Sequence, residues 1–572
     1  MSSNPPSSNW WMFHGDPAHT GEVTGSAIAS SNVANLKLAY SLNVNGSILS
    51  TPAIVDGYVY CGLANSLEAA AQNGGQFIKV ELATGKTVAT YNWSINPADR
   101  DSHGFCGMGC TPAVVNGKVY FSAFDGKLYC LNQSDLTQVW VTDLRYADMP
   151  HNQPVTNDFP NGNGNPSAGI GPYPKAAGWS SPLVAGDRVY LGMGEGENPY
   201  LYGFVYCIDA NSGNVIWMYC TCQFDINANN APNQLPLETI RQALPPGFTT
   251  YPYQPVAKGA SVWSGIAYDP DLDQLYAATG NPQPDGVLPT AAYTNSVLVL
   301  QGSTGAFKAC IQIPAETSYR PSDIDVDIGG APTLWTIDGR KVVGIGCKNG
   351  CFMTFDAKTF DIIKTRQLLP LMNDGSQIPT VDPHGTDDPS DPNPVISNAE
   401  SNVTPAENFH GTYSTAAICT AQQKVFIGVG GNNYHYICPG IDSDNTPFIR
   451  ALDWSTLADA WPLDNGDPKR YTAAADPKNP LYKNASESGI SVPAVVNDVV
   501  FMSTTNVALY AFSVVDGKIL WQDTTGFGQQ TGGMSGGYGY CMGPAIAGNY
   551  VVAGALVRGG NGGVLNIYTL GS

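Results

Sequence analysis

Residues 51–60 read TPAIVDGYVY, and this short phrase decides the fold because it returns along the chain. Close copies are TPAVVNGKVY at residues 111–120 and SPLVAGDRVY at residues 181–190. Weaker copies begin near Ser264, Ala331, Thr415, Val492 and Gly543. A phrase that recurs at intervals of tens of residues is typical of a repeat architecture, in which each copy opens one structural unit.

Each copy leads into a unit of short strands separated by turns. In the second unit, strands are expected at residues 119–121 and 128–131, with glycine turns between them and a closing segment at residues 138–140. The closing residue of the second, third and seventh units is a tryptophan that we expect to pack between units: Trp140, Trp217 and Trp521. Four short strands with glycine turns and a closing tryptophan are typical of one blade of a β-propeller.

The sequence therefore predicts an all-β fold, a single eight-bladed β-propeller domain of four-stranded antiparallel blades over residues 1–572. The last blade lacks a closing strand, which the alternating N-terminal segment 36–42 is expected to supply, because closure removes free sheet edges. Blades are expected at residues 48–93, 108–143, 178–220, 261–313, 328–367, 412–462, 489–524 and 538–570. Insertions rich in Pro, Asn, Asp and Gly are expected to form surface loops around a pocket mouth, at residues 144–177, 221–260, 368–411 and 463–488.

Composition narrows the classes of partner. Hydrophobic residues make up 43% of the chain and charged residues only 13%, with a formal net charge of -20. This charge argues against nucleic acid or an anionic membrane surface as a partner. No stretch of about 18 apolar residues occurs, so we expect no membrane span. A small-molecule substrate is the partner that we expect.

Sequons and cysteines give information on cellular location and on disulfide bonding. Asn-x-Ser/Thr sequons favour a secreted or periplasmic protein of the secretory pathway, although the polar residues 1–9 do not read as a signal peptide. The thirteen cysteines are an odd number, so at least one lies outside any intrachain disulfide. The close pairs are expected to be buried thiols or local disulfides rather than zinc ligands: Cys106 and Cys110, Cys220 and Cys222, Cys347 and Cys351.

These features resemble the quinoprotein dehydrogenase propellers that use pyrroloquinoline quinone (PQQ), and in particular their polyvinyl-alcohol-dehydrogenase-like branch. The resemblance is carried by the blade ends at residues 128–140 and 208–217 and by the opening segment WMFHGDPAHTG at residues 11–21. It is also carried by DVDIGGAP at residues 325–332 and by GRKVVGIGCKNG at residues 339–350. It covers nearly the whole chain and is more specific for fold than for activity.

The resemblance implies an alcohol dehydrogenase whose cofactors are PQQ and calcium. It assigns the calcium ligands to Glu197, Asn281 and Asp325. Such hard oxygen ligands suit calcium. The catalytic base is expected to be Asp325 or Asp323, with the register open among these and Asp327, because a carboxylate beside calcium stays ionised and can accept the alcohol proton.

The remaining assignments concern the quinone itself. Lys348 is expected to contact the quinone oxygen and stabilise the negative charge that develops there, and Trp263 is expected to form the floor beneath the ring. Many members stack PQQ against a disulfide between adjacent cysteines. The nearest equivalents here are Cys106 and Cys110, so Cys110 is assigned to the cofactor.

Three departures from the family pattern keep other functions open. The chain has no adjacent cysteine pair, and arginines that hold PQQ carboxylates are replaced near Cys110 and Tyr202. It has no haem segment, so an external electron acceptor is required. A second hypothesis is therefore a cofactor-free enzyme that orients a hydrophobic natural-product intermediate for cyclisation or hetero-Diels-Alder cycloaddition. A third is a non-catalytic binding or scaffold propeller.

Each site residue also has an ordinary structural interpretation. Asn281 precedes a proline and suits a turn, and Asp323, Asp325 and Glu197 suit solvated loops. Lys348 lies in a Lys-Asn-Gly turn, where a surface lysine is a competing interpretation.

Overall fold

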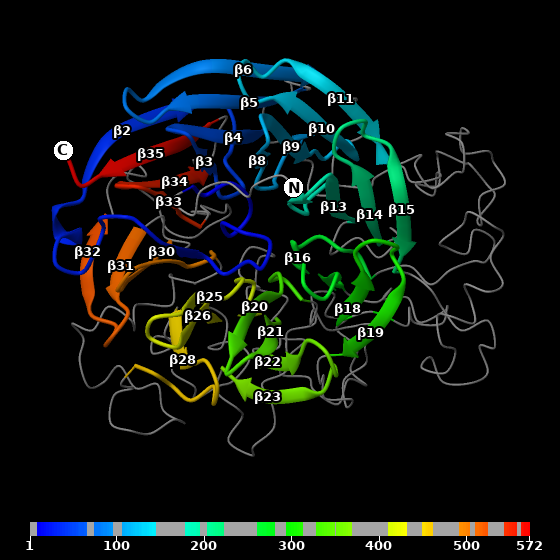
Figure 1. The fold of residues 1–572 in the computed structure, drawn as a ribbon. Coiled ribbons are helices and arrows are strands. Elements are labelled where there is room, and N and C mark those ends of the chain that lie inside the picture. Colours follow the sequence, from blue (N-terminus) through cyan, green and yellow to red (C-terminus); the bar gives the residue numbers. More distant parts are fainter. Residues whose placement is uncertain are drawn as a thin grey trace, which may run out of the picture. The chain divides into compact units, whose positions relative to one another are not determined.

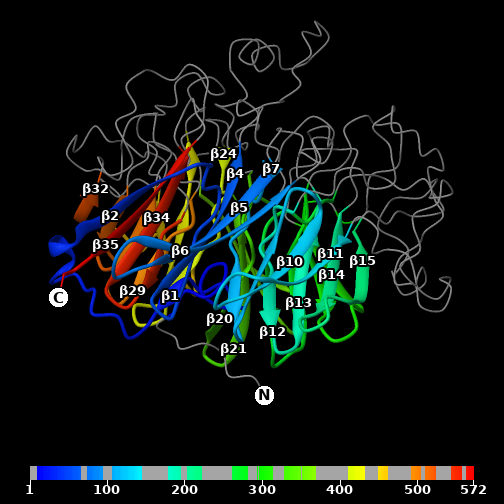
Figure 2. The ribbon, with the colours of Figure 1, turned by 90° about the horizontal axis from the view of Figure 1, so that it is seen from above.

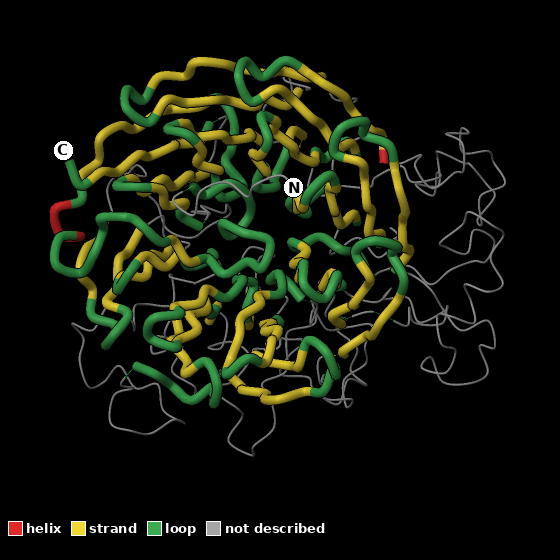
Figure 3. Tube along the Cα trace, viewed as in Figure 1, coloured by secondary structure: helices red, strands yellow, loops and turns green. Residues whose placement is uncertain are grey.

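The computed structural model describes fifteen stretches of chain and the single residue 293. The stretches are residues 9–65, 74–94, 106–144, 178–194, 203–221, 260–280, 295–312, 328–348, 351–368, 410–431, 449–461, 491–503, 509–523, 543–556 and 562–571. The four predicted insertions lie almost entirely outside these residues. Nearly all the regular structure is strand (Figure 3), and η1 (Val33–Asn35) is a short 3-10 helix. Within the described residues, no helix is long and apolar enough to cross a membrane.

The chain forms two compact units, each containing four blade sheets, and the second also contains a separate two-stranded sheet. The first unit is built on Asn45–Ile313. Its sheets, blades 1 to 4, are antiparallel with neighbouring strands in chain order (Figure 1). Blade 1 contains β3 (Ala53–Val55), β4 (Tyr58–Asn65), β5 (Gly74–Glu81) and β6 (Lys86–Ser94), and β7 (Cys106–Gly107) also pairs with β4. Blade 2 contains β8 (Ala113–Val115), β9 (Lys118–Ser122), β10 (Lys127–Asn132) and β11 (Gln138–Asp143). Blade 3 contains β12 (Leu183–Ala185), β13 (Arg188–Met193), β14 (Phe204–Asp209) and β15 (Val215–Cys220). Blade 4 contains β16 (Ile266–Asp269), β17 (Gln274–Ala278), β18 (Ser296–Gln301) and β19 (Phe307–Gln312).

The second unit is built on His14–Val44 and Pro314–Ser572 and contains blades 5 to 8. Blade 5 contains β20 (Thr333–Ile337), β21 (Arg340–Gly346), β22 (Cys351–Asp356) and β23 (Ile362–Gln367). Blade 6 contains β25 (Ala417–Cys419), β26 (Lys424–Gly428) and β28 (Ile449–Asp453), with a short pair of β24 (His410–Gly411) and β27 (Gly430–Gly431) nearby in sequence. Blade 7 contains β29 (Ala494–Val496), β30 (Val499–Ser503), β31 (Leu509–Ser513) and β32 (Ile519–Asp523), joined by β1 (Glu22–Val23). Blade 8 contains β33 (Ala545–Ala547), β34 (Tyr550–Leu556), β35 (Gly563–Thr569) and β2 (Lys37–Val44).

Eight sheets at the predicted positions confirm the eight-bladed β-propeller fold. In blade 2, the first strand β8 is buried along its whole length, whereas the fourth strand β11 is only half-buried or exposed. Burial on both faces explains why the inner strands read as unbroken apolar runs. The turn between β8 and β9 has φ of 54° at Asn116 and 73° at Gly117, the positive values that a tight hairpin turn requires.

The last blade is completed from the N-terminus, as the sequence predicts. The strand β2 pairs antiparallel with β35 (Figure 2). In this pairing Leu42 lies opposite Leu565. Because β2 comes from residues 37–44 and β35 ends at residue 569, the two ends of the chain are joined within one sheet. This pairing satisfies the backbone groups that β35 would otherwise expose at a sheet edge.

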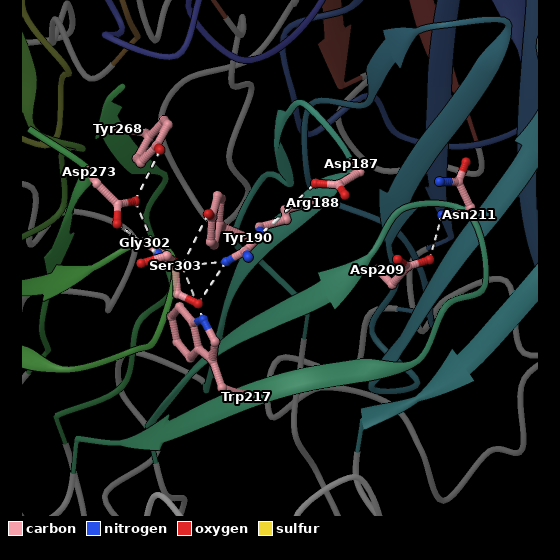
Figure 4. A network of polar contacts seen from close by, with 10 residues as sticks. All are labelled: Asp187, Arg188, Tyr190, Asp209, Asn211, Trp217, Tyr268, Asp273, Gly302 and Ser303. Carbon is pink, nitrogen blue, oxygen red and sulfur yellow. Dashed lines mark hydrogen bonds and ion pairs between the residues drawn. The ribbon is translucent and has the colours of Figure 1, made fainter. Parts of the chain in front are cut away.

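The closing tryptophans connect neighbouring blades, which confirms their predicted packing role. Trp217 Nε1 donates a hydrogen bond of 3.0 Å to the Gly302 carbonyl, to which Tyr190 Oη also donates (Figure 4). Arg188 donates to the next carbonyl, Ser303, at 2.8 Å. A Cβ at Gly305 would lie 2.6 Å from the Trp217 ring, so only glycine lets the turn approach the indole. Trp140 and Trp521 donate in the same way to Ala210 and Leu36.

In the second unit, residues 14–23 run across the first strands of three blades. The carbonyls of Ala18, Thr20 and Gly21 accept hydrogen bonds from Leu334 in blade 5, Ile418 in blade 6 and Val495 in blade 7: the distances are 2.8, 2.8 and 2.7 Å. Two buried imidazoles reinforce these contacts. His14 nitrogens lie 2.7 Å from the His19 carbonyl oxygen and 2.9 Å from that of Pro493, and His19 Nδ1 lies 3.0 Å from that of Pro332.

Candidate functional site

The structure describes three of the seven predicted site residues. Cys110 and Trp263 lie in the first unit, and Lys348 lies in the second. The other four lie outside the described residues: Glu197, Asn281, Asp323 and Asp325. Within the part of the chain that is described, no group of three or more His, Cys, Asp or Glu side chains has the spacing of a metal site. The assignments to a metal therefore stay predictions.

Lys348 is a buried cation two residues after the end of β21, the second strand of blade 5. Its side chain is only 1% exposed, and Nζ lies 4.8 Å above the centre of the Tyr413 ring. The competing interpretation as a surface lysine is therefore wrong. An ammonium group that has left water needs a compensating oxygen or aromatic partner, and the face of a tyrosine is one such partner.

The backbone around Lys348 is held closely. Thr412 donates hydrogen bonds from its amide and its hydroxyl to the Cys347 carbonyl, at 3.0 and 3.2 Å. A Cβ at Gly346 would lie 2.2 Å from Thr412 Oγ1, so glycine there lets the segment before blade 6 approach β21. These contacts place the residue before Lys348 against the segment that carries Tyr413. The lysine and the tyrosine consequently form one local arrangement within the second unit.

Trp263 lies on the segment that leads into blade 4, and its side chain is partly buried. The Val262 amide donates to the Met193 carbonyl at 3.2 Å, and the Gly280 amide donates to the Ser261 carbonyl at 2.8 Å. Gly280 immediately precedes Asn281 in the chain. The backbone that carries Trp263 is therefore bonded to the residue before the predicted ligand Asn281.

Cys110 is a buried free thiol with a backbone partner. Its side chain is 1% exposed, and Sγ donates to the Ser122 carbonyl at 3.3 Å. Burial raises the pKa of this thiol to about 11, so it stays protonated near pH 7. A protonated buried thiol is a poor nucleophile and a poor metal ligand. Of the two alternatives expected for Cys106 and Cys110, buried thiols or a local disulfide, the structure has buried thiols.

Sequence reasoning did not single out two features of this region. Tyr413 occupies the same repeat position as Trp263, four residues before the inner-strand residues Ala417 and Ala267, whose partners are Phe426 and Tyr276. The sequence repeat contains this equivalence of Tyr413 and Trp263, but it can be recognised only after the strand register aligns the two blades. The hydroxyls of Ser261 and Ser264 are the second feature, since both are buried without a hydrogen-bond partner among the described residues.

Two protein-family models match parts of this chain. Residues 174–364 match the model of the glucose/ethanol/alcohol dehydrogenase β-propeller domain. Residues 47–231 match the model of the outer membrane protein assembly factor BamB. Each match covers about three blades, because neighbouring blades of one repeat family share the same pattern.

Curated relatives include quinoprotein alcohol dehydrogenases. The chain is 29% identical over 354 residues to the dehydrogenase subunit of a quinone alcohol dehydrogenase from Komagataeibacter europaeus, a match that covers 59% of this chain and 42% of that protein. It is 23% identical over 574 residues to the quinohemoprotein alcohol dehydrogenase of Comamonas testosteroni, covering 91% of this chain and 70% of that one. The chain thus spans less than half the length of the first relative.

Solved structures share the fold. The quinohemoprotein alcohol dehydrogenase from Comamonas testosteroni superposes with a TM-score of 0.62 at 18% identity, covering 99% of this chain and 81% of that one. A europium-containing methanol dehydrogenase superposes with a TM-score of 0.61 at 15% identity, covering 98% of both chains. At these identities the likeness establishes the propeller fold and leaves activity to be argued from the site.

Proposed function

Because the chain belongs to the PQQ-type quinoprotein dehydrogenase family of β-propellers, we propose that it oxidises an alcohol with bound PQQ and calcium. The observation that carries the proposal is the buried ammonium group of Lys348 above the Tyr413 ring. A buried cation suits a site that stabilises negative charge on an oxygen atom, because its effect is larger away from water. The partly buried indole of Trp263 suits the flat face of a quinone.

The proposed roles follow from the chemistry of each side chain. When bound, PQQ supplies the carbonyl group that accepts the hydride from the alcohol carbon. Asp325 or Asp323 takes the hydroxyl proton of the alcohol, and Lys348 donates a hydrogen bond to the oxygen that becomes negative. Glu197, Asn281 and Asp325 supply oxygen ligands suited to calcium. Two electrons and two protons leave the alcohol, and an external acceptor receives the electrons.

The fit has one weak point, which favours a second candidate function. The Cys110 thiol donates a hydrogen bond to the Ser122 carbonyl and does not form a disulfide against which PQQ could stack. A propeller without that disulfide is also suited to cofactor-free chemistry, in which an apolar intermediate is held in a reactive conformation for cyclisation or cycloaddition. Lys348 would then polarise a carbonyl oxygen of that intermediate.

A reconstitution assay tests the main proposal. Purified protein is loaded with PQQ and calcium and mixed with primary and secondary alcohols and a phenazine-linked dye. We expect dye reduction that requires protein, PQQ and alcohol together, and that chelation of calcium removes before calcium restores it. The control contains PQQ, calcium and dye without protein. Absence of turnover with loaded protein across the alcohol panel would contradict the proposal.

A further inference from the structure

One side-chain position is used in the same way by several blades. In these blades, one residue of the first strand pairs with an aromatic residue of the second strand, and the position lies three residues before the first of these. In blade 2, Ala113 pairs with Tyr120, so the position is Cys110. In blades 2, 3 and 7 the polar side chain at this position forms a hydrogen bond with the backbone near the end of the second strand, twelve residues further along the chain. Cys110 donates to the Ser122 carbonyl at 3.3 Å, and Ser491 donates to the Ser503 carbonyl at 2.7 Å. Ser180 accepts a hydrogen bond from the Gly192 amide at 3.2 Å. In these three blades the position therefore bonds within its own blade, whereas in blade 6 the equivalent Ser414 donates to the adjacent Thr415 carbonyl.

Blade 4 differs from blades 2, 3 and 7. Ser264 occupies the same position, because Ala267 pairs with Tyr276 just as Ala113 pairs with Tyr120. Its side chain is buried, with 7% of the residue exposed, and its hydroxyl has no hydrogen-bond partner among the described residues. A buried hydroxyl without a partner costs about 1–3 kcal/mol. Such a group in a native fold indicates a partner outside the described residues, and a bound ligand is one such partner.

The neighbours of Ser264 indicate what that partner is. Ser264 directly follows Trp263, the residue with the flat partly buried indole. The same segment is bonded through the Ser261 carbonyl to Gly280, the residue before Asn281. The unpartnered hydroxyl is thus held on the piece of backbone to which the proposed function assigns the cofactor floor.

We propose that the Ser264 hydroxyl donates a hydrogen bond to an oxygen atom of the ligand that lies against Trp263. The inference rests on the proposed function, so the ligand is PQQ and the acceptor is one of its carbonyl or carboxylate oxygens. Ser264 is a binding and positioning residue, because a hydroxyl at this place orients the ring without taking part in proton or hydride transfer. The repeat supplies the contrast: equivalent serines in other blades use the same hydroxyl for internal bonding.

The test compares Ser264→Ala with Ser491→Ala, the equivalent serine of blade 7, whose hydroxyl is bonded internally. Affinity for PQQ is measured by calorimetry in the presence of calcium, and the urea midpoint is measured without PQQ. We expect Ser264→Ala to weaken PQQ binding about tenfold with an unchanged or higher urea midpoint. We expect Ser491→Ala to lower the urea midpoint and leave PQQ affinity unchanged.

A third variant tests whether the hydroxyl group itself is responsible for the PQQ affinity. Ser264→Thr keeps the hydroxyl and is expected to bind PQQ more tightly than Ser264→Ala. Equal PQQ affinity of wild type and Ser264→Ala would overturn the Ser264 contact and leave the proposed function standing. Failure of the wild type itself to bind PQQ would overturn the proposed function, and the Ser264 contact with it, so the two failures are distinguished by the wild-type titration.

Discussion

Replacing Lys348 with methionine is expected to lower kcat for PQQ-dependent alcohol oxidation by about 100- to 1,000-fold, the usual effect of removing one preorganised donor from a site that stabilises an oxyanion. Methionine has a similar length and no charge, so the substitution removes the ammonium group above the Tyr413 ring while keeping most of the packing. Dye-linked oxidation at saturating alcohol measures the effect.

Stability separates this result from simple unfolding. Replacing a buried charge by an apolar side chain of similar volume is often neutral or stabilising, so the urea midpoint of Lys348→Met is expected to be equal to that of wild type or higher. Lys364→Met is the matched control, because Lys364 lies exposed on β23 of the same blade. Its turnover is expected to be unchanged. Wild-type turnover in Lys348→Met would show that the buried cation has no part in the reaction.

Lowering the pH from 7 to 4.5 is expected to destabilise the protein strongly through His14 and His19. Burial lowers the pKa of His14 to about 4, although its contacts with the carbonyls of His19 and Pro493 act in the opposite direction. Burial also lowers the pKa of His19 to about 3, with a smaller contribution from the charge of His14. Desolvation therefore outweighs the hydrogen bonds at both imidazoles.

The sign of the effect follows from proton binding. In the unfolded chain both imidazoles have a pKa of about 6.5, so below that pH the unfolded state binds more protons than the folded state. The stabilisation is complete above about pH 6.5 and is lost progressively as the pH falls toward the folded-state values. At pH 4.5 the loss is on the order of 5 kcal/mol for the pair. Burial raises the pKa of Asp16, so this carboxyl offsets part of the loss.

Urea unfolding at several pH values measures this prediction. We expect the midpoint of the wild type to fall steeply below pH 6.5. The double variant His14→Asn/His19→Asn is expected to be less stable at pH 7 but much less sensitive to acid. Single variants should each remove part of the slope. An acid dependence in the double variant as steep as that of wild type would contradict the assignment to these two residues.

Much of the fold could be predicted because a propeller repeats its local signals. The phrase at residues 51–60 marks one inner strand and one hairpin, and strands occur at the expected place in all eight copies. The alternation in residues 36–42 correctly indicated the strand that pairs with β35. The closing tryptophans were recognisable because each follows an apolar residue at the end of its unit, and the Trp217 contacts confirm their role.

The site could be predicted less completely for a physical reason. Periodicity tells which face of a strand is buried, but the burial of a single polar side chain depends on segments that come from another blade. Lys348 looks like a turn residue in its own blade and is buried because the segment carrying Tyr413 covers it. Ser264 looks like the other opening serines in sequence, and its hydroxyl is distinguished by having no hydrogen-bond partner among the described residues. The hydrogen bonds of residues 18–21 to three inner strands likewise depend on chain-distant contacts.

Calorimetric titration of metal-free wild-type protein with PQQ, with and without calcium, tests the central claim most directly. The proposed quinoprotein function predicts saturable one-to-one binding that is much tighter when calcium is present. No binding at high micromolar PQQ with calcium present would contradict the quinoprotein function and favour cofactor-free chemistry on an apolar substrate.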